Sequence, residues 1–183
     1  MGANIGLHSV LLGRMGFAVT CFEPDPNHVA LLTKHLVAND VQDRVSTVQA
    51  AVAPETGVLE FVRVLGNTTG SHVAGAKVFE VQAFSVVEAI TDKDLVKMDV
   101  EGLEADLLTR LDASHFASLD MLCEVGTPEN AEIIWNHLKN SGVNLFSQKS
   151  GWTQVTDLDG MPRSYKEGSL FLSCLDEMPW GAA

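Results

Sequence analysis

The chain has 183 residues, 46% of them hydrophobic and 20% charged, which excludes a disordered protein and predicts a single domain over residues 1–183. Its 12 Lys and Arg against 24 Asp and Glu give a net charge of −12, which disfavours binding to nucleic acid. No apolar run reaches the roughly 18 residues of a membrane span, and the start lacks a signal-peptide pattern. We therefore expect a cytoplasmic protein that binds no membrane.

Strand-like and helix-like patterns alternate along the chain, which predicts an α/β fold with a largely parallel sheet. Helical spacing over residues 5–15 is followed by an apolar strand pattern at 17–23. Asp25 is then placed as an N-cap, with Pro26 at the first helical position. These two residues predict a helix that runs to about residue 40.

The same alternation continues to the end of the chain. Further strands are predicted at residues 45–52, 57–65, 94–100, 119–125, 143–148, 152–158 and 169–175, and helices at 85–90, 103–111 and 127–140. Residues 66–76 are rich in glycine and small polar side chains and predict a loop near the substrate. The last two strands are expected to pair antiparallel across residues 159–168.

The segment Gly-Ala-Asn-Ile-Gly at residues 2–6 has the glycines of a turn that approaches a ligand and opens a helix. A nicotinamide fingerprint would need further glycines here, which disfavours a nucleotide-dependent oxidoreductase. Glu23 follows Gly2 at the spacing where an acid binds ribose hydroxyls in nucleoside-binding α/β folds. The alternative is that the glycines only shape the turn and that Glu23 is a solvated strand end.

Several motifs in the same order resemble the FkbM family of S-adenosylmethionine-dependent methyltransferases. They are GANIGLHS, CFEPDP, AAVAPETG and, most specifically, VKMDVEGLEADLL, and the resemblance runs from Gly2 to about Val125. It implies a class I methyltransferase, a Rossmann-like three-layer fold with a mostly parallel sheet and an antiparallel C-terminal strand. The implied reaction is methylation of a hydroxyl on a sugar, glycan or natural product, so the partner is a small-molecule or glycan acceptor.

The resemblance also implies which residues bind S-adenosyl-L-methionine. Its contacts fall on the glycine turn and on two later segments, namely Gly2, Ala3, Asn4, Gly6, Glu23, Pro24 and Ala51. Family members carry an acidic strand directly before the turn, where this chain has only Met1. We therefore expect the first strand to be missing and the chain to be truncated relative to the family. The unpaired sheet edge that this leaves favours a homo-oligomer.

An acidic cluster is predicted where two neighbouring strands end. Lys97, Asp99 and Glu101 alternate along one strand, and Glu124 ends the next. We predict Asp99 or Glu124 as the base that accepts the proton of the acceptor hydroxyl, with Glu101 as a positioning residue. Alternatively, Lys97 pairs with one of the acids and Glu101 caps the following helix. A metal bridging Asp99 and Glu124 is less favoured, and we expect none.

Acceptor contacts are predicted on the turn and on the small-residue loop. His8 follows the turn, and Ser71 and His72 lie in the loop. A histidine near an acceptor hydroxyl would suit proton transfer. The alternative to an enzyme is a catalytically inactive, methyltransferase-like binding module that kept the sheet.

Overall fold

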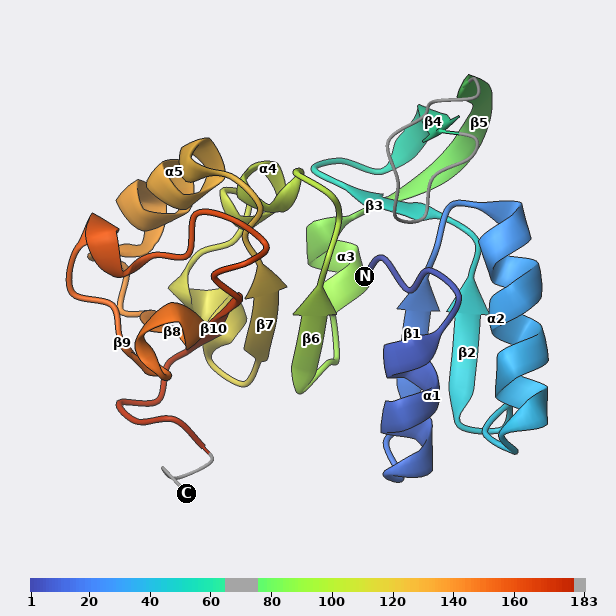
Figure 1. Ribbon diagram of the computed structural model, residues 1–183, viewed down its shortest axis with the longest axis horizontal. Coiled ribbons are helices and arrows are strands. Elements are labelled where there is room, and N and C mark those ends of the chain that lie inside the picture. Colours follow the sequence, from blue (N-terminus) through green and yellow to red (C-terminus); the bar gives the residue numbers. More distant parts are fainter. Residues whose placement is uncertain (65–75, 180–183) are drawn as a thin grey trace. The chain divides into compact units, whose positions relative to one another are not determined.

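The computed structural model describes residues 1–64 and 76–179 (Figure 1). The chain forms two compact units, Met1–Ser85 and Val86–Ala183. Both units mix helices with strands, as the alternating pattern predicts. Within the described residues, no helix is long and apolar enough to cross a membrane. The single-domain assignment stays a prediction.

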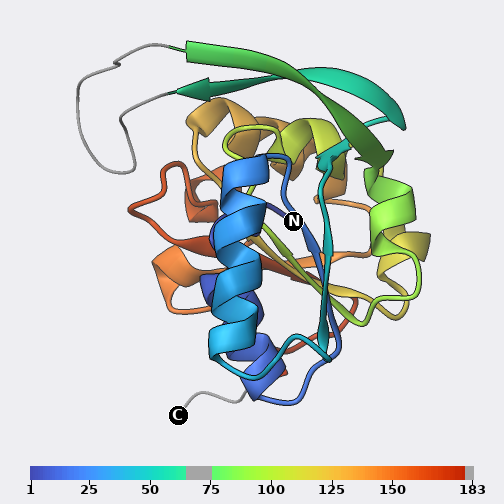
Figure 2. The same cartoon turned by 90° about the vertical axis from the view of Figure 1, so that its right-hand side faces the viewer.

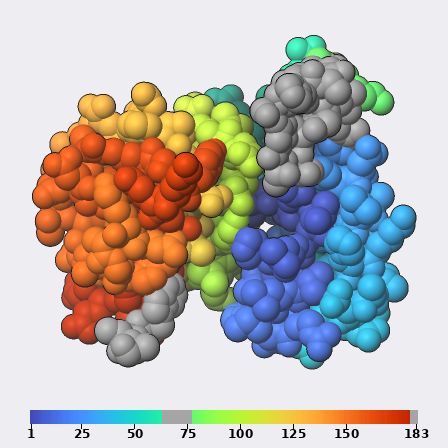
Figure 3. All heavy atoms as spheres, viewed as in Figure 1, coloured from blue at the N-terminus to red at the C-terminus, as the bar shows by residue number. Residues whose placement is uncertain are grey.

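The first unit contains a two-stranded parallel sheet, β1 (Val19–Phe22) and β2 (Val45–Val48), with two helices, α1 (Leu7–Arg14) and α2 (Pro26–Ala38) (Figure 1). Both helices contribute to one core with alternate residues of β1, so they cover the same face of the sheet. That core comprises Cys21, Leu32, Leu36, Val41 and Val45, with Ala3, Val10 and Val19 at its margin. The helix α1, dark blue in Figure 3, exposes Leu7 and Leu11, and Met15, which directly follows the helix, is also exposed.

The predicted start of α2 is confirmed. The Asp25 side chain accepts hydrogen bonds from the backbone N–H groups of Asn27 and His28, and Pro26 is the first helical residue. The helix therefore has both an N-cap acceptor and a residue that needs no N–H partner. Because both features depend only on neighbouring residues, the sequence alone was enough to predict where α2 begins.

A second sheet of the first unit has the order β3-β5-β4, made of β3 (Ala51–Ala53), β4 (Gly57–Val64) and β5 (Ala76–Ser85). β4 and β5 form a long antiparallel ribbon, visible in Figure 2, and β3 pairs parallel with β5. The strand predicted at 45–52 is thus divided into β2 and β3, which belong to different sheets. Phe22 and Phe84 join these sheets with ring centroids 5.8 Å apart.

The second unit holds a five-stranded sheet in the order β6-β7-β10-β8-β9. Its strands are β6 (Leu95–Met98), β7 (Asp120–Glu124), β8 (Asn144–Ser147), β9 (Thr153–Gln154) and β10 (Ser169–Ser173). Its helical segments are α3 (Val86–Ile90), α4 (Glu104–Leu108), η1 (Ala113–Phe116), α5 (Pro128–Leu138), η2 (Gln148–Ser150) and η3 (Leu158–Gly160). β6 and β7 are parallel, whereas β10 runs antiparallel to both of its neighbours. The expected antiparallel C-terminal strand is present, but the expectation of a largely parallel sheet is wrong for this unit, because only β6 and β7 pair parallel in its sheet.

The expected pairing of the last two strands is wrong. β9 pairs with β8, and β10 inserts between β7 and β8. Gly151 has a left-handed backbone (φ 73°), and the Trp152 N–H donates to the Ser147 carbonyl at 2.7 Å, so the chain folds back onto β8 at once. The apolar run Leu170, Phe171 and Leu172 favours a central strand instead, and in β10 all three residues are buried.

Candidate functional site

The glycine turn has the backbone that its sequence predicts. Gly2, Asn4 and Gly6 all lie in the left-handed region, with φ values of 70°, 50° and 93°. Glycine adopts this conformation without strain, and asparagine is among the few other residues that tolerate it. The Ala3 N–H donates to the Phe22 carbonyl at 3.0 Å, which ties the turn to the end of β1.

Glu23 lies against this turn. Its side chain is buried, and the Asn4 N–H donates to Oε2 at 2.7 Å. Oε1 accepts from the Asp25 N–H at 3.0 Å and lies 3.2 Å from His28 Nδ1. A carboxylate offers about four acceptor positions, so these contacts leave about one for a ligand hydroxyl. Glu23 is therefore not a solvated strand end, because its buried carboxylate organises the turn.

Gly6 has a packing role that the sequence did not reveal. A Cβ at this position would lie 2.1 Å from Leu32 Cδ1, so only glycine lets the start of α1 meet α2. The sequence predicted that a ligand approaches the backbone closely here. At Gly6 the group that does so is the side chain of Leu32 in the core.

The other predicted contact residues of the first unit are spread along it. Pro24 follows Glu23 and is half-buried, and Ala51 opens β3, where it pairs with Ala83. His8 is exposed in the first turn of α1. Ser71 and His72 lie outside the described residues, so their predicted acceptor contacts stay predictions.

In the second unit, the predicted alternation along β6 ends early. The strand stops at Met98, so Asp99 and Glu101 belong to the turn that follows it. Lys97 forms an ion pair with Asp99, as the alternative interpretation anticipated. Glu101 has φ 53° and Gly102 φ 104°, so the backbone turns sharply where regular alternation was expected.

Asp99 and Glu124 interact, which brings two of the three predicted carboxylates together. Burial, followed by a hydrogen bond with Asp99 and the charge of that residue, raises the pKa of Glu124 from 4.5 to about 6. Lys97 opposes this effect and the Glu101 charge adds to it. Glu124 is therefore poised to exchange a proton near neutral pH. Within residues 1–64 and 76–179, no group of three His, Cys, Asp or Glu side chains is arranged to hold a metal ion.

Glu104 organises the turn at residues 99–104, the acidic turn, and the sequence analysis missed this role. Its side chain is fully buried, and Oε1 accepts from the N–H groups of Gly102 (3.1 Å) and Val100 (3.3 Å). Oε2 accepts from Asn130 Nδ2 at 2.9 Å. The capping role considered for Glu101 is not seen, because the N-cap of α4 is Leu103 and no side chain caps it. The signal in the sequence that could have indicated this role is that Glu104 stands only two residues after Gly102.

Tyr165 is a second residue that the sequence analysis missed. Its hydroxyl donates to Glu101 Oε2 at 3.5 Å, although the two residues lie far apart in the chain. Burial, then the charges of Glu101, Glu104, Glu124 and Asp99, raise the pKa of Tyr165 to about 12. The phenol therefore stays protonated beside the carboxylates. No local pattern could have shown this, since only tertiary folding joins them.

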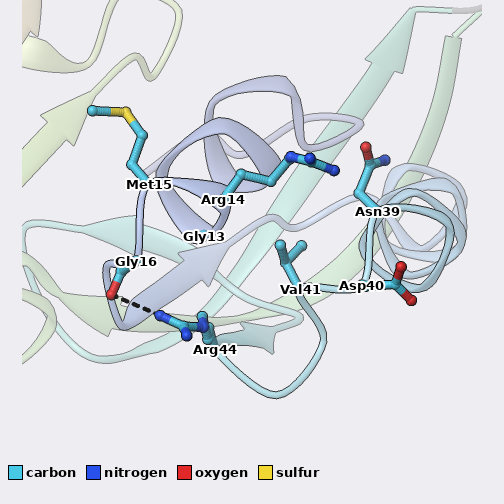
Figure 4. A pocket seen from close by; sticks show the side chains of 8 residues that line it. All are labelled: Gly13, Arg14, Met15, Gly16, Asn39, Asp40, Val41 and Arg44. Carbon is cyan, nitrogen blue, oxygen red and sulfur yellow. Dashed lines mark hydrogen bonds between the residues drawn. The ribbon is translucent and has the colours of Figure 1, made fainter.

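A pocket of about 420 Å³ lies elsewhere, at the C-terminal end of α1 (Figure 4). Its lining residues come from the ends of the two helices and the loop after α2: Gly13, Arg14, Met15, Gly16, Asn39, Asp40, Val41 and Arg44. The Arg44 side chain donates to the Gly16 carbonyl at 3.2 Å, shown by the dashed line. The glycine turn precedes the opposite end of α1, so this pocket is separate from the predicted cofactor contacts.

Comparison with known proteins gives two matches. The Methyltransferase FkbM domain model matches residues 1–142. The crystal structure of methyltransferase FkbM from Methylobacillus flagellatus KT superposes with a TM-score of 0.53 at 15% sequence identity, over 93% of this chain. This chain spans 41% of the length of that one, and at this identity the likeness shows the fold alone. No curated protein matches the chain.

Proposed function

We propose that this chain, which belongs to the Methyltransferase FkbM domain family, is a methyltransferase. It would transfer a methyl group from S-adenosylmethionine to a hydroxyl of a sugar, glycan or natural product. The observation that carries the proposal is the family match over residues 1–142, because it includes the glycine turn, Glu23, the acidic turn and Glu124. The proposal includes a Rossmann-like class I fold.

The cofactor would be held by the first unit, at Gly2, Ala3, Asn4, Gly6, Glu23, Pro24 and Ala51. The contact between the Asn4 N–H and Glu23 supports this assignment, because it unites the two motifs on which nucleoside binding depends. The free acceptor position of Glu23 suits one ribose hydroxyl. S-adenosylmethionine would supply a methyl group that is already activated on a sulfonium. The chain itself then needs only to orient the acceptor and remove its proton.

Glu124 is proposed as the base, with Asp99 as its hydrogen-bonded partner. At neutral pH a carboxylate with a pKa of about 6 is mostly ionised, yet it is more basic than an ordinary one. Lys97 holds Asp99 by an ion pair, and Glu101 is proposed to orient the acceptor. The net charge of −12 favours a neutral or cationic acceptor and disfavours nucleic acid and anionic membranes.

Isothermal titration with S-adenosylhomocysteine, the demethylated form of the cofactor, tests the proposal. We expect micromolar binding to the wild-type chain and at least about tenfold weaker binding to Glu23→Gln, because hydrogen bonds to a charged group contribute about 1.5–3 kcal/mol. Glu55→Gln, an exposed acid of the same unit, is the matched control and keeps the wild-type affinity. Equal affinity in Glu23→Gln, or no binding by the wild-type chain, would contradict the proposal.

A further inference from the structure

Tyr165 lies beyond residue 142, where the family match ends, and yet its hydroxyl reaches Glu101 inside the matched segment. It is the one tyrosine of the 183-residue chain, and the residue is 45% exposed. The residue thus combines a hydroxyl directed at a carboxylate with an aromatic surface open to solvent. Such a pair of features suits contact with a bound molecule.

The ring of Tyr165 is seated on Gly126, which follows β7 and Glu124 closely. A Cβ at Gly126 would lie 2.3, 2.4 and 2.7 Å from Tyr165 Cζ, the phenol oxygen and Cε1. Any side chain at this position would therefore displace the ring. Because Gly126 does not have a left-handed backbone, alanine would move Tyr165 without straining the main chain.

The loop that carries Tyr165 is held by its own polar contacts. The Arg163 N–H donates to Glu167 Oε2 at 2.6 Å, and Lys149 pairs with Glu167 Oε1 at 3.4 Å. Lys149 also donates to the Asp159 carbonyl at 3.1 Å, and Met161, which belongs to the loop, is fully buried. These contacts fix the loop on both sides of the tyrosine, so its position beside Glu101 is built into the fold.

We propose that Tyr165 is an acceptor-binding residue that helps to select which hydroxyl compounds the acidic turn receives. The phenol O–H donates to Glu101, and its oxygen lone pairs accept from a hydroxyl of the acceptor. The exposed ring packs on the C–H face of the same molecule. A ring with hydroxyl groups at its edge and C–H groups on its face, as in a pyranoside, meets both requirements. This inference rests on the proposed function for the identity of the acceptor.

The test uses the full chain with isotope-labelled tyrosine, which gives ring signals from Tyr165 alone. Methyl glycosides of glucose, galactose, mannose, fucose and rhamnose are titrated without any methyl donor, and the tyrosine signals are followed by NMR. We expect at least one glycoside to shift these signals saturably. Absence of a saturable shift with every glycoside would overturn the inference.

Two variants sharpen this result. Gly126→Ala displaces the ring and is expected to weaken glycoside binding at least about tenfold, whereas Gly57→Ala, where a Cβ meets nothing within 4 Å, leaves it unchanged. Tyr165→Phe, followed through the glycoside's own signals, is expected to weaken binding by roughly threefold to tenfold through the lost hydroxyl. Unchanged affinity in both Gly126→Ala and Tyr165→Phe would overturn the inference.

The two proposals fail in different ways. Glycoside binding at Tyr165 without binding of S-adenosylhomocysteine would reject the methyltransferase and retain the acceptor site. Binding of S-adenosylhomocysteine with no response at Tyr165 would do the reverse.

Discussion

Two turns of the molecule each hold a residue other than glycine in the left-handed backbone region. This residue is Asn4 in the glycine turn (residues 2–6) and Glu101 in the acidic turn (residues 99–104). Each turn is also held by a buried glutamate that accepts backbone N–H groups. The two turns differ in how far along the chain this glutamate lies from the turn that it holds. Glu104 lies two to four residues from the amides it accepts, whereas Glu23 reaches Asn4 across 19 residues.

The acidic turn is thus held by local hydrogen bonds, whereas the hydrogen bond between Asn4 and Glu23 is a tertiary contact. The acidic turn carries a nearby acceptor for its backbone N–H groups in Glu104. The glycine turn acquires its acceptor only when β1 is in place. Each carboxylate has three protein contacts, but only Glu23 makes them at the turn that is proposed to bind the cofactor. We therefore expect Glu104 to matter for stability and Glu23 for stability and binding together.

The largest effect is expected from Glu104→Leu, which leaves the amides of Val100 and Gly102 and the Asn130 side chain without their acceptor. Buried donors that lose a charged partner are costly, and we expect a loss of about 3 kcal/mol in the free energy of unfolding. Urea denaturation measures it. Glu132→Leu, at an exposed position of α5, is the control, with a change within about 0.5 kcal/mol. A loss below about 1 kcal/mol in Glu104→Leu would show that the acidic turn does not depend on this carboxylate.

The two glycines that follow the left-handed residues offer a second, smaller contrast. Gly6→Ala adds an overlap with Leu32 to the backbone strain at φ 93°, whereas Gly102→Ala adds strain alone, because a Cβ there meets nothing within 4 Å. We expect a loss of about 1–2 kcal/mol at Gly102 and about 1–3 kcal/mol more at Gly6, measured by denaturant unfolding.

A double variant checks the cause of the larger loss. Adding Leu32→Ala to Gly6→Ala removes the overlapping atom, so the two substitutions should cost less together than the sum of their separate effects. Strict additivity would mean that the overlap with Leu32 is not the reason.

The smallest effect is a pH dependence caused by Glu124. Its pKa rises from 4.5 in the unfolded chain to about 6 in the folded one, so between these values the folded state binds more protons than the unfolded state. The free energy of unfolding should therefore decrease as pH rises through this window and level off above it. Methyl transfer should increase over the same range, because the base must be ionised.

Glu124→Gln should remove this slope. Its amide can donate to Asp99 at every pH, so we expect stability at neutral pH to stay equal or to rise by less than about 1 kcal/mol. Unfolding curves recorded across the window measure the slope, with Glu129→Gln as an exposed control that retains it. An unchanged slope in Glu124→Gln would assign the titration to another group.

The parts of the molecule that depend on neighbouring residues were predictable from the sequence. Asp25 and Pro26 identified the start of α2, and the glycines at 2 and 6 identified the turn, because capping and left-handed backbones have local signatures. The spacing between Gly2 and Glu23 singled out that acid as a candidate ribose ligand, but not its contact with the Asn4 N–H.

The parts that depend on distant residues were not predictable. Nothing near Thr153 indicates that β9 joins β8 and leaves β10 in the centre of the sheet. Tyr165 reaches Glu101 across 64 residues, and no local pattern encodes such a contact. Glu104 was overlooked for another reason: an acid at a helix start fits a favourable helix dipole as well as a buried acceptor.

The central claim is that the glycine turn and Glu23 bind the methyl donor, and mapping backbone amide signals by NMR during titration with S-adenosylhomocysteine tests it most directly. We predict saturable shifts at Gly2, Asn4 and Gly6 of the turn and at Asp25, because the Asn4 and Asp25 N–H groups donate to the Glu23 carboxylate. The pocket at the other end of α1 is the internal control, and its residues, such as Gly16, should stay unshifted. Shifts confined to that pocket, or none at the turn, would contradict the claim.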